Sequence, residues 1–273
     1  MIHRRWSRVL GSCALAALAC LGPIPVEAKR KPAEAAAART AAETYEAGVA
    51  ALMAGDERKA LSLLQAIQYL GDERTQLEPK VRLAIADATF YQGYSIARID
   101  ARSLYSDFAT LYSDHPGAPY ALFQSAMCAM SEMKHPSKDQ VDTHQTMADL
   151  SEVVRRYPTS PWARAATRMR RIAERRLAEH EFLVGRFYVQ RKRPLAAIAR
   201  FRNVLDDYPS YPERDKVYLY LGRALLASKN DVEARIYLDK LVRDYPDGRY
   251  AEEARRELAR AGGQLDLGVK QAP

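Results

Sequence analysis

Histidine, cysteine, serine and carboxylate side chains supply most nucleophiles, general bases and metal ligands, and this chain does not space them for such work. Its five histidines are scattered, and no two stand where cysteine or a carboxylate would complete a metal site. Cys128 is flanked by Met127 and Met130 in an apolar stretch, which favours a small core residue over a nucleophile. His180 falls inside a long predicted helix, where packing or an interhelical hydrogen bond is the simplest role.

Phosphate chemistry also lacks its signature. The 13 glycines are scattered singly, and no glycine-rich loop ends in Gly-Lys followed by Ser or Thr. Active-site serine motifs are absent as well. We therefore predict that the chain is not an enzyme and uses no cofactor and no metal.

Arginine and aromatic side chains remain as candidates for binding. The formal net charge is +8, and eight arginines stand between Arg155 and Arg176 against one acid, Glu174. A helix face of this kind is by default solvated, but its one-sided charge also suits an acidic partner. The residues that recur on this face at steps of three and four are Arg164, Arg168, Arg171 and Arg175.

A second candidate set is aromatic. Four tyrosines stand at the ends of the repeated segments described below and two stand inside them, where each ring would seal a seam between helices: Tyr112, Tyr157, Tyr208 and Tyr245, with Tyr188 and Tyr218. Four other aromatic residues are predicted to line a groove that grips an extended or helical peptide: Phe90, Tyr91, Tyr94 and Tyr105.

The elements that would position these residues are helices. Ser160 is a good N-cap and Pro161 suits the first helical position, so a long helix is expected to begin there and to run without a second proline until Pro194. Apolar residues recur along it at helical spacing. No alternation typical of strands with hairpin turns is found, so the predicted class is all-α.

The helices are predicted to form repeated hairpins. A glycine precedes an alanine by twelve residues in three places, at Gly48, Gly185 and Gly222, which indicates equal helix contacts. Four segments end in an aromatic residue followed by proline, which stops a helix. The pattern resembles the tetratricopeptide repeat. It fits best at Tyr218, Leu221, Gly222, Ala234 and Leu238, and at Gly185, Tyr188, Ala197 and Phe201.

We accordingly predict a tetratricopeptide-like superhelical solenoid of about five helical hairpins with a C-terminal capping helix. The repeat domain is placed at residues 41–261, with the first three repeats at Ala41–Leu70, Pro79–His115 and Ala118–Tyr157 and the cap at Gly248–Ala261. Lys134–Gln145 is expected to interrupt the third repeat. Residues 29–40 are read as a tether and residues 262–273 as a flexible tail.

The first 28 residues have the pattern of an export signal, with arginines ahead of an apolar run from Val9 to Leu21. Three cleavage patterns are present. Ala17-Leu18-Ala19-Cys20 resembles the lipobox of bacterial lipoproteins, so Cys20 is the favoured lipidation site. Val26-Glu27-Ala28 suits ordinary signal peptidase and would leave a soluble periplasmic protein. Leu10-Gly11-Ser12-Cys13 leaves almost no apolar segment ahead of the cut.

Residues 139 to 246 closely resemble the BamD family of outer membrane assembly lipoproteins. The resemblance rests on Asp139-Gln140 with Thr143, Arg156-Tyr157-Pro158-Thr159-Ser160, Arg168, Leu177-Ala178-Glu179-His180-Glu181, Phe187-Tyr188, Ala196-Ala197, Arg200-Phe201 and Asp207-Tyr208-Pro209. The chain departs from the family in its weak lipobox, in Lys192-Arg193-Pro194 where a glycine-containing turn is usual, and in its divergent first two repeats.

The resemblance implies a lipid-anchored scaffold on the periplasmic face of the outer membrane. C-terminal repeats would dock on the barrel-forming subunit BamA, beside other assembly lipoproteins, and N-terminal repeats would receive unfolded outer membrane proteins. Arg200 becomes the leading interface candidate, with Arg202 and Arg193 nearby, because an arginine fork suits a partner carboxylate. No nucleic acid is expected. The alternatives are a periplasmic repeat adaptor for cell-wall synthesis or envelope constriction, and a catalytic or accessory enzyme domain.

Overall fold

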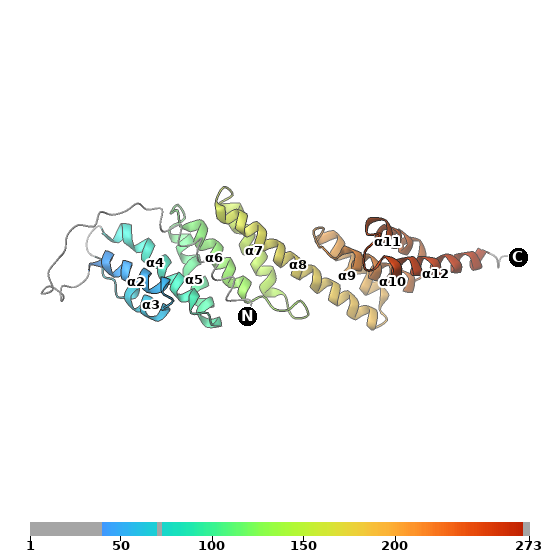
Figure 1. Cartoon of the computed structure of the whole chain (residues 1–273), viewed down its shortest axis with the longest axis horizontal. Coiled ribbons are helices and arrows are strands. Elements are labelled where there is room, and N and C mark those ends of the chain that lie inside the picture. The colour runs from blue at the N-terminus through green and yellow to red at the C-terminus, as the bar shows by residue number, and fades with distance from the viewer. Residues whose placement is uncertain (1–39, 70–72, 270–273) are drawn as a thin grey trace. The chain divides into compact units, whose positions relative to one another are not determined.

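The computed structural model describes residues 40–69 and 73–269, and the leader, the predicted lipidation site at Cys20 and most of the tether lie outside them. Every regular element in the described part is a helix (Figure 1). In chain order these are α2 (Ala41–Met53), α3 (Glu57–Gln65), α4 (Glu73–Tyr91), α5 (Ser95–Leu111), α6 (Ala118–Ser131), α7 (Val141–Arg156), α8 (Pro161–Gln190), α9 (Pro194–Asp207), α10 (Arg214–Ala227), α11 (Asp231–Asp244) and α12 (Ala251–Val269).

The helices follow one another as five pairs, with α12 after the last, so the predicted all-α repeat architecture is confirmed. The chain divides into two compact units. Of the described residues, the first takes in those through Glu132 together with Asp149–Ala166, and the second takes in Met133–Ala148 and those from Thr167 onward. Within the described residues, none of the helices combines the length and the hydropathy needed to cross a bilayer.

Capping residues explain several helix starts. Thr40 accepts a hydrogen bond from the amide of Glu43, whose carboxylate accepts one in return from the Thr40 amide, and this reciprocal pair begins α2. The Ser160 hydroxyl oxygen accepts from the Ala163 amide at 3.1 Å, so α8 begins where its cap and proline predict. α8 then runs unbroken to Gln190.

Other boundaries differ from the sequence-based placement. α4 begins at Glu73, ahead of the predicted start at Pro79, and that proline lies inside the helix. α7 begins at Val141, within the stretch expected to interrupt the third repeat. α12 continues to Val269, beyond the predicted end of the cap at Ala261. At each of these boundaries, residues that disfavour a helix stand beside residues that favour one. Periodicity alone does not determine where such a helix begins or ends.

The repeated glycines make the close helix contacts that their spacing predicts, but with different partners. A β-carbon added at Gly185 would lie 2.5 Å from the Phe201 ring, and one at Gly222 would lie 2.6 Å from Leu238. The partner is thus the large apolar residue sixteen positions later, whereas the alanines twelve positions later are simply fully buried: Ala60, Ala197 and Ala234. Only glycine leaves room for a large side chain at this contact.

The turn between the paired helices needs a left-handed residue in four of the pairs. Gly55 and Gly93 supply it in the first two, with φ of 79° and 80°. Lys192 and Lys229 adopt the same region in later pairs, with φ of 53° and 62°. The turn geometry therefore persists where the usual glycine is replaced, because the packed helices on either side fix it.

Candidate functional site

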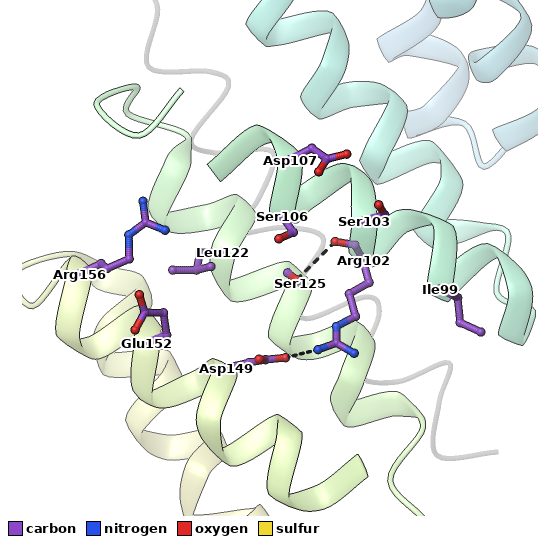
Figure 2. A pocket seen from close by; sticks show the side chains of 10 residues that line it. All are labelled: Ile99, Arg102, Ser103, Ser106, Asp107, Leu122, Ser125, Asp149, Glu152 and Arg156. Carbon is purple, nitrogen blue, oxygen red and sulfur yellow. Dashed lines mark hydrogen bonds and ion pairs between the residues drawn. The ribbon is translucent and has the colours of Figure 1, made fainter. Parts of the chain in front are cut away.

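The first unit contains a cleft of about 550 Å³ over α5, α6 and α7 (Figure 2). Its lining combines charged side chains, serine hydroxyls and two aliphatic residues. These are Ile99, Arg102, Ser103, Ser106 and Asp107 from α5, Leu122 and Ser125 from α6, and Asp149, Glu152 and Arg156 from α7.

Helical spacing explains why α5 offers so many of these residues. Ile99, Ser103 and Ser106 recur at steps of three and four, so they share one face of the helix. The opposite face carries Tyr105 and Phe108, which are fully buried in the core of the unit. The apolar face of α5 is thereby committed to packing, and the mixed face is left open to a ligand.

Two arginines in the cleft are held by neighbouring helices. Arg102 pairs with Asp149 at 2.8 Å between Nη2 and Oδ2, which joins α5 to α7. Its carbonyl oxygen accepts from the Ser125 hydroxyl at 3.4 Å. Arg156 donates to the carbonyl of Ala109 at 3.2 Å. The cleft is therefore a surface of fixed charges and hydroxyls that can form hydrogen bonds with a polar ligand.

The predicted aromatic groove is only partly open. Tyr105 is fully buried, and its hydroxyl donates to Asp87 Oδ1 at 2.6 Å, so the prediction that Tyr105 lines a groove is wrong. Phe90 packs edge to face on both Tyr91 and Tyr105, at 5.4 Å and 6.5 Å between ring centres. Tyr94 is 55% exposed, and its hydroxyl donates to Gln92 at 2.5 Å. None of these four residues lines the cleft of Figure 2.

The residues with possible chemistry have structural roles. Cys128 is buried, and burial raises the pKa of its thiol to about 12, so the thiolate needed for nucleophilic attack is suppressed. His180 Nδ1 lies 2.7 Å from the Pro136 carbonyl oxygen in the second unit. Within the described part of the chain, no group of three His, Cys, Asp or Glu side chains is placed to hold a metal ion.

The second unit holds the three arginines predicted for partner contact. The side chain of Arg200 on α9 is 40% exposed, and its Nη1 donates to both carboxylate oxygens of Glu181 at 3.1 and 3.2 Å. Arg202 pairs with Glu233 on α11. Arg193 is exposed at the N-cap of α9 and makes no capping hydrogen bond. Glu181 thus holds one nitrogen of Arg200 and fixes the direction of the rest of its fork.

The arginines predicted to form a basic face on α8 are all exposed: Arg164 in the first unit, and Arg168, Arg171 and Arg175 in the second. Arg175 reaches Glu213 at 3.1 Å. Arg176, which was not among the candidates, instead caps the carbonyls of Met133 and Lys134 at 2.9 and 2.7 Å. The exposed set is available to a partner, whereas Arg176 is structural.

Comparison with known proteins places this geometry in a family. The family model described as outer membrane lipoprotein, YfiO, matches residues 37–230, and a tetratricopeptide repeat model matches residues 216–248. The chain belongs to the YfiO family. Its similarity to BamD, suggested by the motifs between residues 139 and 246, is thereby confirmed at the level of the family.

Relatives within the YfiO family carry the name outer membrane protein assembly factor BamD. The protein from Caulobacter vibrioides is 30% identical over 151 residues, which are 55% of this chain and 50% of that protein. The one from Rickettsia prowazekii is 25% identical, over 69% of this chain and 73% of the relative. A putative BamD from Aquifex aeolicus is 25% identical, over 82% and 73%. The matched region thus spans about half of the Caulobacter relative and about three quarters of the others.

Sequence reasoning missed both the cleft and the acid beside Tyr105. Asp87 offered a signal, because it is the single charge in the apolar run from Leu83 to Phe90. The cleft offered none, since its residues come from three helices and are individually ordinary surface types.

Proposed function

We propose that this chain is a non-catalytic scaffold of outer membrane protein assembly. The observation that carries the proposal is membership of the YfiO family across residues 37–230, together with relatives named as BamD assembly factors. The paired-helix architecture supports it, because stacked hairpins present rigid, extended surfaces that hold other polypeptides. The fixed charges of the cleft and the exposed arginines of the second unit are surfaces of this kind.

In this proposal the two units have separate tasks. The first unit receives unfolded outer membrane proteins through the cleft and through three aromatic residues that are not fully buried: Phe90, Tyr91 and Tyr94. The second unit docks on a BamA-like barrel-forming subunit through Arg200, Arg202 and Arg193, and the exposed arginines of α8 face acidic surfaces of that subunit or of other assembly lipoproteins. Acylated Cys20 tethers the chain to the periplasmic face of the outer membrane.

Replacing Arg200 by glutamate is expected to reduce recovery of the barrel-forming subunit at least tenfold in a crosslinked pull-down from the cell envelope. The substitution removes the guanidinium fork and places a negative charge where a partner carboxylate would bind. The matched control is Arg243→Glu, an exposed arginine on α11 whose side chain is 73% accessible. Its recovery should equal that of the parent.

A glutamate at position 200 also lies beside Glu181, so folding needs a separate check. Arg200→Gln retains an amide that can donate to Glu181, and it should fold like the parent while still losing most of the partner. Equal recovery of the barrel subunit with all three variants would rule out Arg200 as the docking residue. Recovery of cell-wall enzymes in place of a barrel protein would overturn the assembly function itself.

Replacing Cys20 by alanine tests the tether. The parent, expressed with its leader, is expected to enter the detergent phase when an envelope extract is separated with Triton X-114. The Cys20→Ala variant should enter the aqueous phase, because the acyl chains that hold a lipoprotein in a membrane are absent. A parent protein found in the aqueous phase would instead indicate cleavage after Ala28.

A further inference from the structure

Asp87 lies at the centre of a polar cluster inside the first unit. Its Oδ1 accepts hydrogen bonds from the hydroxyls of Tyr105 on α5 and Tyr120 on α6, each at 2.6 Å. The Tyr120 hydroxyl in turn accepts from the buried amide of Gln124 at 3.0 Å. Three helices therefore converge on one carboxylate and fix its orientation.

This carboxylate carries a charge that nothing in the described part of the chain balances. Asp87 forms no ion pair with any described residue. Its pKa is raised by its own burial and lowered by the hydrogen bonds from the hydroxyls of Tyr105 and Tyr120. Burial is the larger influence and raises the pKa of Asp87 to about 6. At neutral pH the group is nevertheless mostly ionised, so it is a desolvated anion without a counter-charge.

The cluster is not sealed. Asp87 as a residue keeps partial exposure, whereas Tyr105 and Tyr120 beneath it are buried. Tyr91 stands one helical turn after Asp87 on α4, which places both on the same face of that helix. Tyr45 of α2 packs against the apolar group that contains Ala84, one turn before Asp87. Both tyrosines, like Asp87, are partly exposed.

The electrostatic environment agrees with this placement. Burial raises the pKa of both Tyr45 and Tyr91 to about 12, and the Asp87 charge adds to the shift in each case. The two hydroxyls thus lie within reach of the Asp87 field and remain protonated. Their rings keep the negative faces that attract a cation.

We propose that Asp87, with Tyr45 and Tyr91 beside it, binds an arginine or lysine side chain of a partner polypeptide. A cation placed there would pair with the carboxylate and lie against the faces of two aromatic rings. The carboxylate has an oxygen to offer, because Oδ2 accepts no hydrogen bond from the described residues. A long side chain reaches such a recessed anion, whereas a bound metal ion would need further oxygen ligands that the committed tyrosine hydroxyls do not supply. The inference rests on the proposed function, since it gives the first unit a polypeptide to hold.

The test compares two small probes of equal shape. N-acetyl-arginine methylamide carries the cation, and N-acetyl-citrulline methylamide is its neutral isostere. Each is titrated into the full processed chain with labelled tyrosine rings, and NMR shifts of Tyr45 and Tyr91 are followed at pH 7.5. We expect the arginine probe to bind at least tenfold more tightly than the citrulline probe.

The Asp87→Asn variant should bind both probes with the weak affinity that the parent shows for citrulline. It retains the oxygen that accepts from Tyr105 and Tyr120, so it is expected to fold. The control Asp100→Asn, on an exposed residue of α5, should bind as the parent does. Equal binding of the two probes by the parent, or unchanged arginine binding by Asp87→Asn, would overturn the proposal. Neither result depends on the pull-down that tests the assembly function.

Discussion

The variant Lys216→Met is expected to destabilise the second unit by about 2 kcal/mol, below the scale for removing one partner of a fully buried ion pair because both carboxylate partners are partly exposed. The side chain of Lys216 on α10 is only 9% exposed. Its ammonium pairs with Glu179 of α8 at 2.9 Å and with Glu213 at 2.7 Å. It also lies 4.3 Å from the centre of the Phe182 ring. Methionine preserves the aliphatic stem but leaves the half-buried carboxylate of Glu179 with the Tyr211 hydroxyl in place of a cation.

The ionisation of Lys216 predicts the pH range of this effect. Burial would lower its pKa, but hydrogen bonds to Glu213, Tyr211 and Glu179 outweigh burial and raise the pKa above the usual lysine range. A cationic group whose pKa is higher in the folded than in the unfolded state contributes its full stabilisation at pH values below the unfolded-state pKa. That stabilisation is lost only as the pH rises through the folded-state pKa. The difference between parent and variant in urea unfolding should therefore be constant from pH 6 to pH 9.

Two further variants make the measurement decisive. Lys192→Met changes an exposed lysine in a turn of the same unit and should alter the free energy of unfolding by less than about 0.5 kcal/mol. Adding Glu179→Gln to Lys216→Met removes the uncompensated charge and should restore part of the loss. A loss below about 1 kcal/mol for Lys216→Met would show that the ion pairs contribute little beyond packing. Hydrogen exchange of α8 and α10 would locate the loss within the unit.

The variant Asp87→Asn is expected to stabilise the first unit by about 2 kcal/mol at pH 7.5, taking a shift of roughly two pKa units at about 1.4 kcal/mol each and allowing for partial solvation. Burial raises the pKa of Asp87 to about 6, so its ionisation opposes folding at neutral pH. Asparagine removes the charge and keeps the acceptor for Tyr105 and Tyr120. Trp162 lies 5.0 Å from Tyr120 between ring centres, so its fluorescence reports unfolding of this unit.

The sign of the pH dependence follows from the raised pKa. The folded state holds the Asp87 proton more tightly than the unfolded state, so the penalty develops between the unfolded pKa of 3.8 and the folded value of about 6. The advantage of Asp87→Asn should thus be greatest above pH 7 and vanish near pH 4. The groups facing Asp87 are Tyr45, Tyr91, Tyr105, Tyr120 and Cys128, and all have pKa values raised far above this range.

Comparing variant with parent at each pH isolates Asp87 from carboxylates that act in the opposite sense. Hydrogen bonds from arginine lower the pKa of Glu78 and of Glu152, and these contributions are shared by both proteins. Asp100→Asn on the exposed face of α5 should change stability by less than about 0.5 kcal/mol at any pH. An advantage of Asp87→Asn that does not change with pH, or a loss of stability, would contradict the assigned ionisation.

The sequence by itself determined the helical class, the hairpin repeat and the family resemblance. These depend on local signals that act without the rest of the fold: the apolar period of α8, the cap at Ser160, the prolines that stop helices, and glycines where a large side chain must fit. The same local view misplaced the start of the second hairpin, because Pro79 signals a boundary but is absorbed inside α4.

Only the tertiary structure decided which side chains serve binding and which serve the core. Tyr105 and Tyr94 are both tyrosines that the sequence assigned to the same groove. Packing buries Tyr105 against Asp87 and leaves Tyr94 exposed. Arg176 caps a loop while Arg168 and Arg171 remain exposed, although all occupy the same arginine-rich stretch. The physical reason is that periodicity fixes the face on which a residue lies, whereas its partners depend on how separate helices pack and in what register.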